Sequence, residues 1–338
     1  MRKLLHLYFV VSSIFLIVSC EKFIINKDDG NTPENNFELL WKKVDENYSF
    51  FELKGVNWDS IYRVYRPEIH NNISDQALFK IMADMLHELR DGHVNLYSDF
   101  DQSRNLEWYS GFPANFSYTL LADNYLVNDF KRTDNFIIKN FDSVGYILSE
   151  TFAGNIESGE IDDLIDHLSE MKGIIFDIRN NSGGLSKNSE IVSSRFADHK
   201  RLVSYTLYKS GPGHNDFTPP QPNYVSPAGN RQYTQQVVLL TNRRTYSAAN
   251  DFVISMSAFP HVTIMGDSTG GGGGTPYDYE LFNGWRFRIP KTQTLSPEGF
   301  NIENGITPDI EVNMRTNDIN RGIDTILEAA IEYINAGT

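Results

Sequence analysis

Ser247 is the residue whose type and position most clearly suggest catalysis. It lies in the segment Thr245-Tyr246-Ser247-Ala248-Ala249, between an apolar run at residues 236–241 and a stretch with helical spacing of its apolar residues. A serine at such a strand-to-helix turn faces the positive end of the helix, and the next amide, on Ala248, points toward whatever the hydroxyl attacks. The alternative is that Ser247 is only a helix N-cap, which is a common role for serine.

Two further sites would complete such chemistry. Gly183 and Gly184 follow the apolar run at residues 173–178, and their missing side chains allow backbone amides to approach a ligand. A serine hydroxyl also needs a base within hydrogen-bond reach. His93 is the candidate, because it follows Arg90-Asp91-Gly92 at the end of a helix, whereas the other histidines lie in segments that look like helix faces or surface loops.

The elements that must position these residues can be read from the apolar pattern. Residues 173–178 and 236–241 are continuous apolar runs, which is typical of parallel strands covered on both faces. Loops at the carboxyl ends of such strands converge on one edge of the sheet, where ligands bind. Other segments are predicted as helices (after Thr32, after Asn57, from Ser74 to a stop at Gly92, near 189–196 and near 319–334) and as short strands (118–121, 125–127 and 144–148).

Composition narrows the class of protein. The chain has 338 residues, 40% of them hydrophobic, with 30 Lys and Arg against 44 Asp and Glu, for a net charge of −14. The hydrophobic fraction is sufficient for a large core, and the negative net charge argues against a nucleic-acid partner. The single cysteine excludes an internal disulfide and a thiolate metal site, and no other metal or cofactor motif is found.

The N-terminus is predicted to be a targeting signal rather than part of the folded domain. Arg2-Lys3, an apolar run over 4–18 and Ser19-Cys20 match a secretory signal, and the last four residues resemble the lipobox of bacterial lipoproteins. Cys20 would then carry the lipid that anchors the chain in the bacterial cell envelope, on the periplasmic or outer-surface side. The alternative is an ordinary signal peptide with a chance cysteine. The predicted division is signal peptide 1–19, tether 20–31, helical subdomain 32–93 and α/β core 94–338.

Four motifs in order, taken together, resemble the C-terminal processing (tail-specific) serine peptidase family, in its tricorn-core-like branch. They are Leu89-Arg90-Asp91-Gly92-His93-Val94, Asp177-Ile178-Arg179-Asn180-Asn181-Ser182-Gly183-Gly184, Thr245-Tyr246-Ser247-Ala248-Ala249 and Glu303-Asn304-Gly305-Ile306-Thr307-Pro308-Asp309. The resemblance implies an α/β fold with a ClpP/crotonase-like spiral core behind a small helical bundle, and a peptide or protein substrate.

The resemblance also implies roles for particular residues. Ser247 matches the nucleophile, His93 the base, Glu303 the acid that supports the base, and Gly184 and Ala248 the amides of an oxyanion hole. The family's Ser–Lys dyad has no counterpart, because the window after Ser247 holds the glycine run 270–274 and no lysine. The run is interpreted as space for substrate backbone near Ser247. Gly92 replaces the serine that links acid and base in tricorn, so an indirect link is expected here. The stretch from Val94 to Val144 is too short for a PDZ module of roughly ninety residues.

Two other classes of function stay open at this level. The same fold holds hydrophobic ligands in a retinoid-binding protein, and related folds include acyl-CoA enzymes and esterases, although Ser247 lacks a Gly-x-Ser-x-Gly elbow. Four arginines could hold a substrate carboxylate, although arginines are common on any surface: Arg243, Arg244, Arg286 and Arg288.

Overall fold

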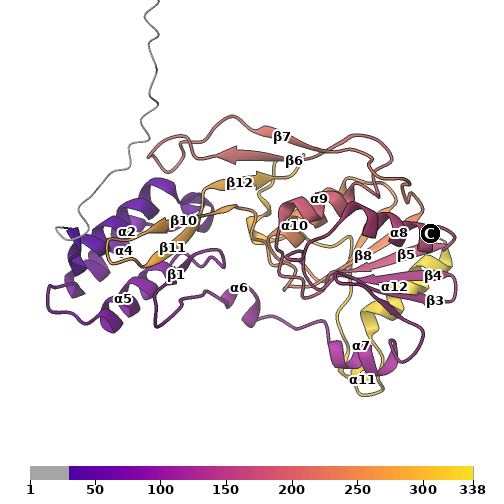
Figure 1. The fold of residues 1–338 in the computed structure, drawn as a ribbon. Coiled ribbons are helices and arrows are strands. Elements are labelled where there is room, and N and C mark those ends of the chain that lie inside the picture. The colour runs from indigo at the N-terminus through magenta and orange to yellow at the C-terminus, as the bar shows by residue number, and fades with distance from the viewer. Residues whose placement is uncertain (1–29, 338) are drawn as a thin grey trace, which may run out of the picture.

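The N-terminal part of the chain is a small helical body (Figure 1). The computed structural model describes residues 30–337. The helices are α2 (Pro33–Asn47), α3 (Phe51–Lys54), α4 (Trp58–Tyr65), the 3-10 turn η1 (Arg66–Glu68) and α5 (Asp75–His87). The side chains of Thr32, Asn57 and Ser74 cap α2, α4 and α5 by accepting hydrogen bonds from first-turn amides. The three predicted helices are therefore confirmed.

The end of α5 differs from the prediction. The helix stops at His87, and the chain turns at Arg90, whose φ of 49° places it in the left-handed region. Gly92 is thus not the helix stop, and its role is in packing near the site described below.

The helical body also contains a hairpin from much later in the chain. Strands β10 (Pro276–Glu280) and β11 (Arg286–Pro290) pair with β1 (Asn95–Tyr97) in a three-stranded antiparallel sheet of order β1-β11-β10. Leu281, Trp285, Phe287 and Ile289 of this hairpin share one buried cluster with the helices. A boundary at residues 93 and 94 therefore does not separate two compact bodies, because long-range pairing joins residues 276–290 to the N-terminal helices.

The larger body is built on a seven-stranded mixed sheet of order β13-β9-β8-β5-β4-β3-β2. The strands are β2 (Lys131–Arg132), β3 (Ile137–Phe141), β4 (Val144–Leu148), β5 (Gly173–Asp177), β8 (Gln236–Thr241), β9 (Val262–Gly266) and β13 (Ile310–Glu311). From β4 to β13 every pairing is parallel, whereas β2 and β3 are antiparallel to their neighbours. The predicted parallel strands at 173–178 and 236–241 are thus neighbours, and the predicted α/β class is confirmed.

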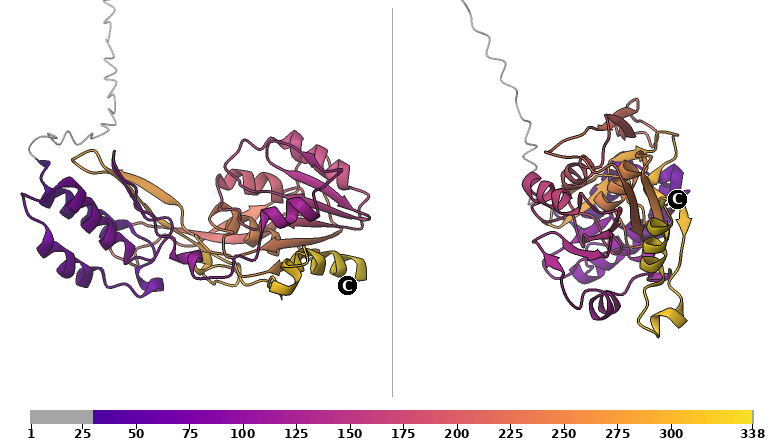
Figure 2. Two further views of the ribbon diagram at one scale, coloured as in Figure 1. Left: turned by 90° about the horizontal axis from the view of Figure 1, so that it is seen from below. Right: turned by 90° about the vertical axis from the view of Figure 1, so that its right-hand side faces the viewer.

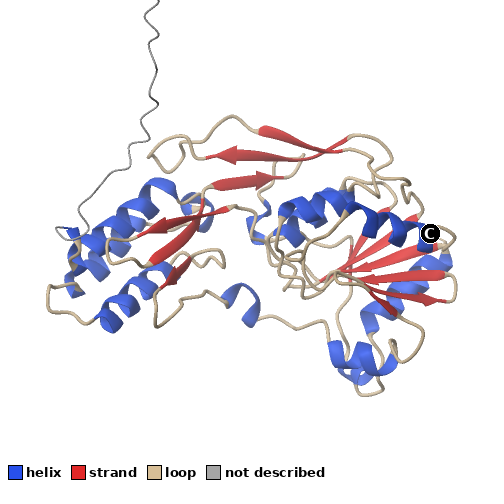
Figure 3. Cartoon of the chain, viewed as in Figure 1, coloured by secondary structure: helices blue, strands red, loops and turns tan. Residues whose placement is uncertain are grey.

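Helices cover both faces of this sheet (Figure 3). One buried cluster joins the sheet to α8 (Ser158–Leu168), α9 (Ser186–Ser193) and α10 (Ala248–Ser257). The cluster on the other face includes α7 (Tyr118–Asn124) and α12 (Thr325–Ala336). Two short helices, α6 (Glu107–Ser110) and α11 (Thr316–Ile319), lie in connecting segments.

Two predicted strands are wrong. Residues 118–121 belong to helix α7, because Ser117 caps it and Leu120 and Leu121 lie buried on one side. Residues 125–127 continue from that helix as turn and bend, not as a strand.

A third sheet spans the two bodies (Figure 1). It has the order β12-β6-β7 and consists of β6 (Arg201–Tyr208), β7 (Gln221–Val225) and β12 (Thr292–Leu295). The Pro- and Gly-containing stretch at residues 211–229 therefore includes strand β7. Figure 2 shows the elongated shape that results, with the helical body at one end and the seven-stranded sheet at the other.

A buried ion network anchors α12 to the sheet and gives a stability prediction. The Arg179 guanidinium lies 2.6 Å from Asp177 and 2.9 Å from Asp324, and all three side chains are fully buried. Arg179→Met would leave two buried carboxylates without a cation, which is expected to lower the free energy of unfolding by about 3–5 kcal/mol. Urea unfolding is the measurement. As a control, Arg321→Met removes an exposed arginine from its ion pair with Asp318, and a loss of more than about 1 kcal/mol there would contradict the argument.

Candidate active site

Ser247 occupies a constrained turn between β8 and α10. It is the N-cap residue of α10, with φ of 57° and ψ of −127°, a conformation that L-residues rarely adopt. The turn is fixed by the hydrogen bond from the Ser247 amide to the Gly271 carbonyl and by that from the Asp251 amide to the Ser247 carbonyl. The side chain itself makes no capping hydrogen bond. The hydroxyl is therefore presented to the cavity rather than used to start the helix.

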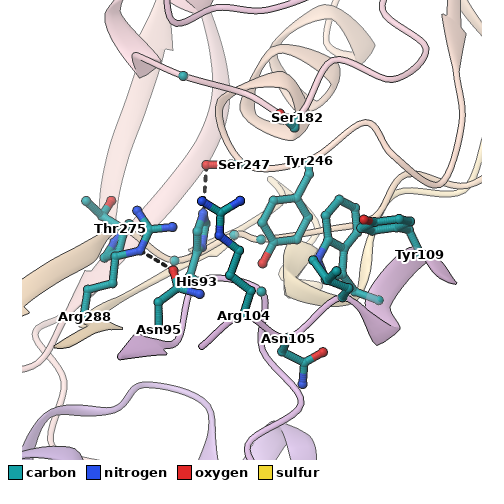
Figure 4. Close-up of a pocket in the computed structure, with 18 of the residues that line it drawn as sticks. His93, Asn95, Arg104, Asn105, Tyr109, Ser182, Tyr246, Ser247, Thr275 and Arg288 are labelled. Carbon is teal, nitrogen blue, oxygen red and sulfur yellow. Dashed lines mark hydrogen bonds between the residues drawn. The ribbon is translucent and has the colours of Figure 1, made fainter. Parts of the chain in front are cut away.

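His93 reaches Ser247 from the other body. Its Nε2 lies 2.9 Å from Ser247 Oγ, although 154 residues separate the two in sequence (Figure 4). The loop that carries His93 is fixed because its backbone amide donates to Asp91 Oδ1 at 2.8 Å, and Tyr48 donates to the other oxygen of the same carboxylate at 2.9 Å. The structure thus brings together the two residues proposed from the sequence as nucleophile and base.

The surroundings of His93 favour a neutral ring. Its side chain is buried, and burial together with the charges of Arg288 and Lys54 lowers the pKa to about 4, although Asp91 and the Gly274 backbone oppose the shift. An imidazole that is neutral at pH 7 is able to accept the proton of a serine hydroxyl. The geometry and the protonation state both suit a general base.

Two backbone amides beside Ser247 are free to bind an oxyanion. Among residues 30–337, the amides of Gly184 and Ala248 donate no hydrogen bond, whereas Gly183 donates to Asn181 Oδ1 and Ala249 donates to Tyr246. The two loops touch, since a Cβ on Gly183 would lie 2.8 Å from both the Ala248 nitrogen and Ser247 Cβ. Only glycine fits this contact, where φ is 97°. Both predicted oxyanion donors are therefore available next to the hydroxyl.

Glu303 does not contact His93. It lies in the 3-10 turn η2 (Ile302–Asn304), where its carboxylate is 2.8 Å from Lys54 Nζ and accepts from the Gly273 amide at 2.9 Å. In the described part of the chain, His93 Nδ1 has no hydrogen-bond partner. Burial and the nearby Asp91 raise the pKa of Glu303 to about 8, although Lys54 and the Gly273 amide act in the opposite direction. A direct contact between this acid and the base is thus absent, as the glycine at position 92 suggested.

A buried polar group behind His93 takes the place of a direct acid–base contact. Lys54 Nζ bonds Glu303, donates to the Arg90 carbonyl at 3.0 Å and lies 3.8 Å from Asp91. Lys54 and Tyr48 belong to the helical body, so this group joins the two bodies under the histidine loop. Sequence reasoning missed Lys54, which stands in a four-residue helix without any motif. Asp91 was quoted in the first motif without a role, and its neighbour His93 was the available signal.

Gly92 is required by two aromatic rings. Trp108 and Tyr246 stack with centroids 4.0 Å apart, and a Cβ at Gly92 would lie 2.6 Å from Trp108 Nε1 and 2.9 Å from the Tyr246 hydroxyl. A serine at this position therefore has no room to bridge Glu303 and His93.

This crowding makes Gly92→Ser a sharp test. We expect it to lower kcat for peptide hydrolysis by about tenfold or more, since displacing Tyr246 moves the adjacent Ser247 by a fraction of an ångström. Gly111→Ser is the matched control, because a Cβ there meets nothing within 4 Å. An increase in kcat for Gly92→Ser would show that the missing serine link can be restored.

The Ser247–His93 pair opens into a cavity of about 710 Å³ between the two bodies. Its wall includes Asn95, Arg104, Tyr109, Ser182 and Arg288, all shown in Figure 4. The volume suits a few residues of an extended peptide. Among the described residues, no cluster of His, Cys, Asp and Glu is arranged to hold a metal ion.

The glycine run lines this cavity and also packs inward. Gly272, with φ of 78°, lies against the Tyr246 ring, where a Cβ would come within 2.6 Å. A Cβ on Gly271 would lie 1.8 Å from the Glu303 carbonyl. The run is therefore needed for the close approach of the protein's own loops, in addition to any approach of substrate.

An α/β fold that places a serine–histidine pair and two free amides at the carboxyl ends of its parallel strands defines a serine-type peptidase. Two family models match the sequence: peptidase family S41 over residues 143–312 and the tricorn protease C1 domain over residues 29–87. The first match covers half of the chain, and the chain belongs to peptidase family S41.

Individual proteins agree with this assignment. A solved structure of a candidate peptidase from Parabacteroides merdae ATCC 43184 is 44% identical, with a TM-score of 0.85 over 90% of this chain and 96% of that one. The crystal structure of mature CPAF has the same fold, with a TM-score of 0.68 at 12% identity over 90% of this chain and 96% of that chain.

The curated relatives are longer proteins. The carboxy-terminal processing protease CtpA of Bacillus subtilis (strain 168) is 27% identical over 158 residues, which are 46% of this chain and 32% of that protein. The match spans between 32% and 44% of the length of the three curated relatives.

Proposed function

We propose that this protein is a serine peptidase that hydrolyses peptide bonds through an acyl-enzyme. The observation that carries the proposal is the 2.9 Å contact between His93 Nε2 and Ser247 Oγ beside two amides without acceptors. His93 takes the hydroxyl proton as Ser247 attacks the scissile carbonyl, and the resulting oxyanion is held by the amides of Gly184 and Ala248. His93 then gives the proton to the leaving amine, and water hydrolyses the acyl-enzyme by the same steps.

In this scheme Glu303 does not touch the His93 imidazole but helps to hold the loop that carries it. Its ion pair with Lys54 and its bond to the Gly273 amide connect the helical body to the glycine run. Glu303, Lys54 and Asp91 are therefore positioning residues, which hold the imidazole in line with the hydroxyl.

Fluorophosphonate labelling tests the nucleophile directly. The reagent should modify the wild-type protein at a single site that peptide mapping assigns to Ser247, and Ser247→Ala protein should remain unlabelled. Cleavage of a peptide library by wild-type protein should be lost in the same variant. Labelling at another serine, or undiminished cleavage by Ser247→Ala protein, would overturn the proposal.

The alternative of a hydrophobic-ligand carrier is not favoured by the cavity. Three arginines, three asparagines and an aspartate are among its lining residues, and a site for an apolar ligand is lined mainly by apolar side chains.

We further propose that the chain is exported and anchored by a lipid on Cys20 in a bacterial cell envelope. The support is the charged, apolar and Ser-Cys pattern of residues 1–20, which lie outside the described part of the structure. No helix within residues 30–337 is both long and apolar enough to cross a bilayer. Incorporation of an alkyne fatty acid into wild-type but not Cys20→Ser protein, in a bacterial host, tests the anchor. Equal labelling of both proteins would rule it out.

A further inference from the structure

The cavity at Ser247 has an unusual charge for this protein. The chain carries 44 acidic against 30 basic residues, yet the cavity wall holds three arginines and only one carboxylate. The arginines are Arg104, Arg244 and Arg288, and the carboxylate is Asp251. Burial raises the pKa of Asp251 to about 6, although the hydrogen bond with Ser186 opposes the shift, so this single carboxyl is still mostly ionised at pH 7.

The three arginines have no carboxylate partner within residues 30–337. Elsewhere in the described chain, arginines such as Arg66, Arg195 and Arg201 form ion pairs at 2.6 to 2.8 Å. Arg104 instead donates to Gln102, and Arg244 lies over the Tyr109 ring at 4.4 Å. Unpaired guanidinium groups gathered at one cavity in an acidic protein indicate a ligand with negative charge.

Arg288 is the arginine that is held in a fixed position. Its Nε donates to Asn95 Oδ1 at 2.6 Å, and Asn95 is only 2% exposed and also accepts from the Tyr97 hydroxyl. Figure 4 shows this contact beside His93. In the described chain the terminal nitrogens of Arg288 make no hydrogen bond. Asp278, its neighbour across β10, is exposed and forms no ion pair with it.

The other arginines that the sequence analysis noted for carboxylate binding have different surroundings. Arg243 donates to the carbonyls of Trp108 and Thr269 and stacks on Phe112, so it holds loops together. Arg286 does not line the cavity. Only Arg288 combines an immobilised guanidinium with a position next to the reacting pair.

We propose that Arg288 determines specificity by binding a carboxylate of the substrate close to the scissile bond, while Arg104 and Arg244 add positive charge at the cavity wall. The inference rests on the proposed peptidase function and names its substrate class. Such a carboxylate has two sources: an acidic side chain, or the free C-terminus of a short peptide. A guanidinium already fixed on Asn95 loses little freedom when it binds a planar carboxylate through its two terminal nitrogens.

Matched peptides test the inference. One series has blocked ends and carries Glu or Gln at each of three positions on either side of a cleavage site. A second series carries Gln throughout and either a free or an amidated C-terminus. We expect kcat/KM to be about tenfold or more higher for the carboxylate member of one pair, and the series that shows it identifies the source.

Variants of Arg288 test whether this residue causes the preference for a carboxylate. In Arg288→Gln protein the ratio of kcat/KM between the two members should fall toward one. Arg288→Lys should retain part of the ratio, because lysine keeps the positive charge but lacks the two parallel N–H donors of the guanidinium. Arg286→Gln is the control, since it removes the same charge two residues away on β11 and should keep the full ratio. A ratio near one in the wild type at every position would overturn the proposal, as would a full ratio in Arg288→Gln protein.

A binding measurement separates this inference from the peptidase function itself. Ser247→Ala protein should bind the favoured carboxylate peptide about tenfold more tightly than its neutral match, and the double variant with Arg288→Gln should not. Absence of cleavage and of Ser247 labelling would defeat the peptidase proposal, whatever the binding result. Cleavage without any carboxylate preference would defeat only the role of Arg288.

Discussion

Ser247→Ala protein is expected to lose at least about 10⁴-fold in kcat for peptide hydrolysis, with the fold intact. The variant removes only the oxygen that His93 faces at 2.9 Å, and the side chain makes no capping bond that the helix would miss. What remains is binding together with the amides of Gly184 and Ala248, a residual contribution comparable to that of other serine hydrolases without their nucleophile. His93→Gln should have an effect of similar size, and combining the two substitutions should add little further loss, because both groups serve one step.

Ser247→Gly protein distinguishes a strained catalytic residue from an ordinary cap. At φ 57° and ψ −127° a glycine is unstrained, so this variant should be inactive yet more stable than the wild type by roughly 1 kcal/mol, despite the greater backbone entropy of glycine in the unfolded chain. Thermal unfolding of the wild type, Ser247→Ala and Ser247→Gly proteins is the measurement. A lower melting temperature for Ser247→Gly than for Ser247→Ala would show that the turn is not strained.

The reacting residues are more evident in the sequence than the residues that support them. Ser247, His93 and the two glycine-loop amides stand in local motifs, and each motif specifies a turn with its own side chain or amide. The parallel strands β5 and β8 then carry their loops to one edge, as their continuous apolar runs indicated. Periodicity was sufficient for these elements because both faces of the strands are buried.

The support depends on contacts that no local pattern specifies. Lys54 pairs with Glu303 across 249 positions of the chain, and the hairpin of β10 and β11 joins helices formed more than 180 residues earlier. Neither has a turn or a spacing that indicates its partner. The strand prediction for residues 118–121 is wrong for a different reason. Their apolar and β-favouring side chains suit a strand, whereas the cap at Ser117 and the burial of one side favour a helix.

The pH dependence of activity provides a second large effect. His93 must be neutral to accept the hydroxyl proton, and burial lowers its pKa to about 4. The acid limb of kcat/KM should therefore lie near pH 4 rather than near the ordinary histidine value of about 6.5. At pH 5 about nine-tenths of the protein would carry a neutral His93, against about 3% for an unshifted histidine, a difference of roughly thirtyfold in rate.

The lowered pKa of His93 also makes the free energy of unfolding depend on pH, in a direction that follows from the sign of the shift. A histidine with a pKa lower in the folded state binds more protons when the chain is unfolded, so its contribution to stability is complete above about pH 6.5 and is lost as the pH falls toward 4. Glu303, with its pKa raised to about 8, contributes with the opposite sign, since its stabilisation is lost as the pH rises through that value.

Comparison with His93→Gln protein isolates the histidine, because Glu303 is present in both proteins. Between pH 6.5 and pH 4 the free energy of unfolding should fall more steeply in the wild type than in the variant, by about 3 kcal/mol over the whole window. Urea unfolding at several pH values measures this difference, and initial rates on an uncharged peptide over the same range locate the acid limb. Parallel stability curves together with an acid limb near pH 6.5 would mean that water reaches His93 in the folded protein and that burial does not lower its pKa.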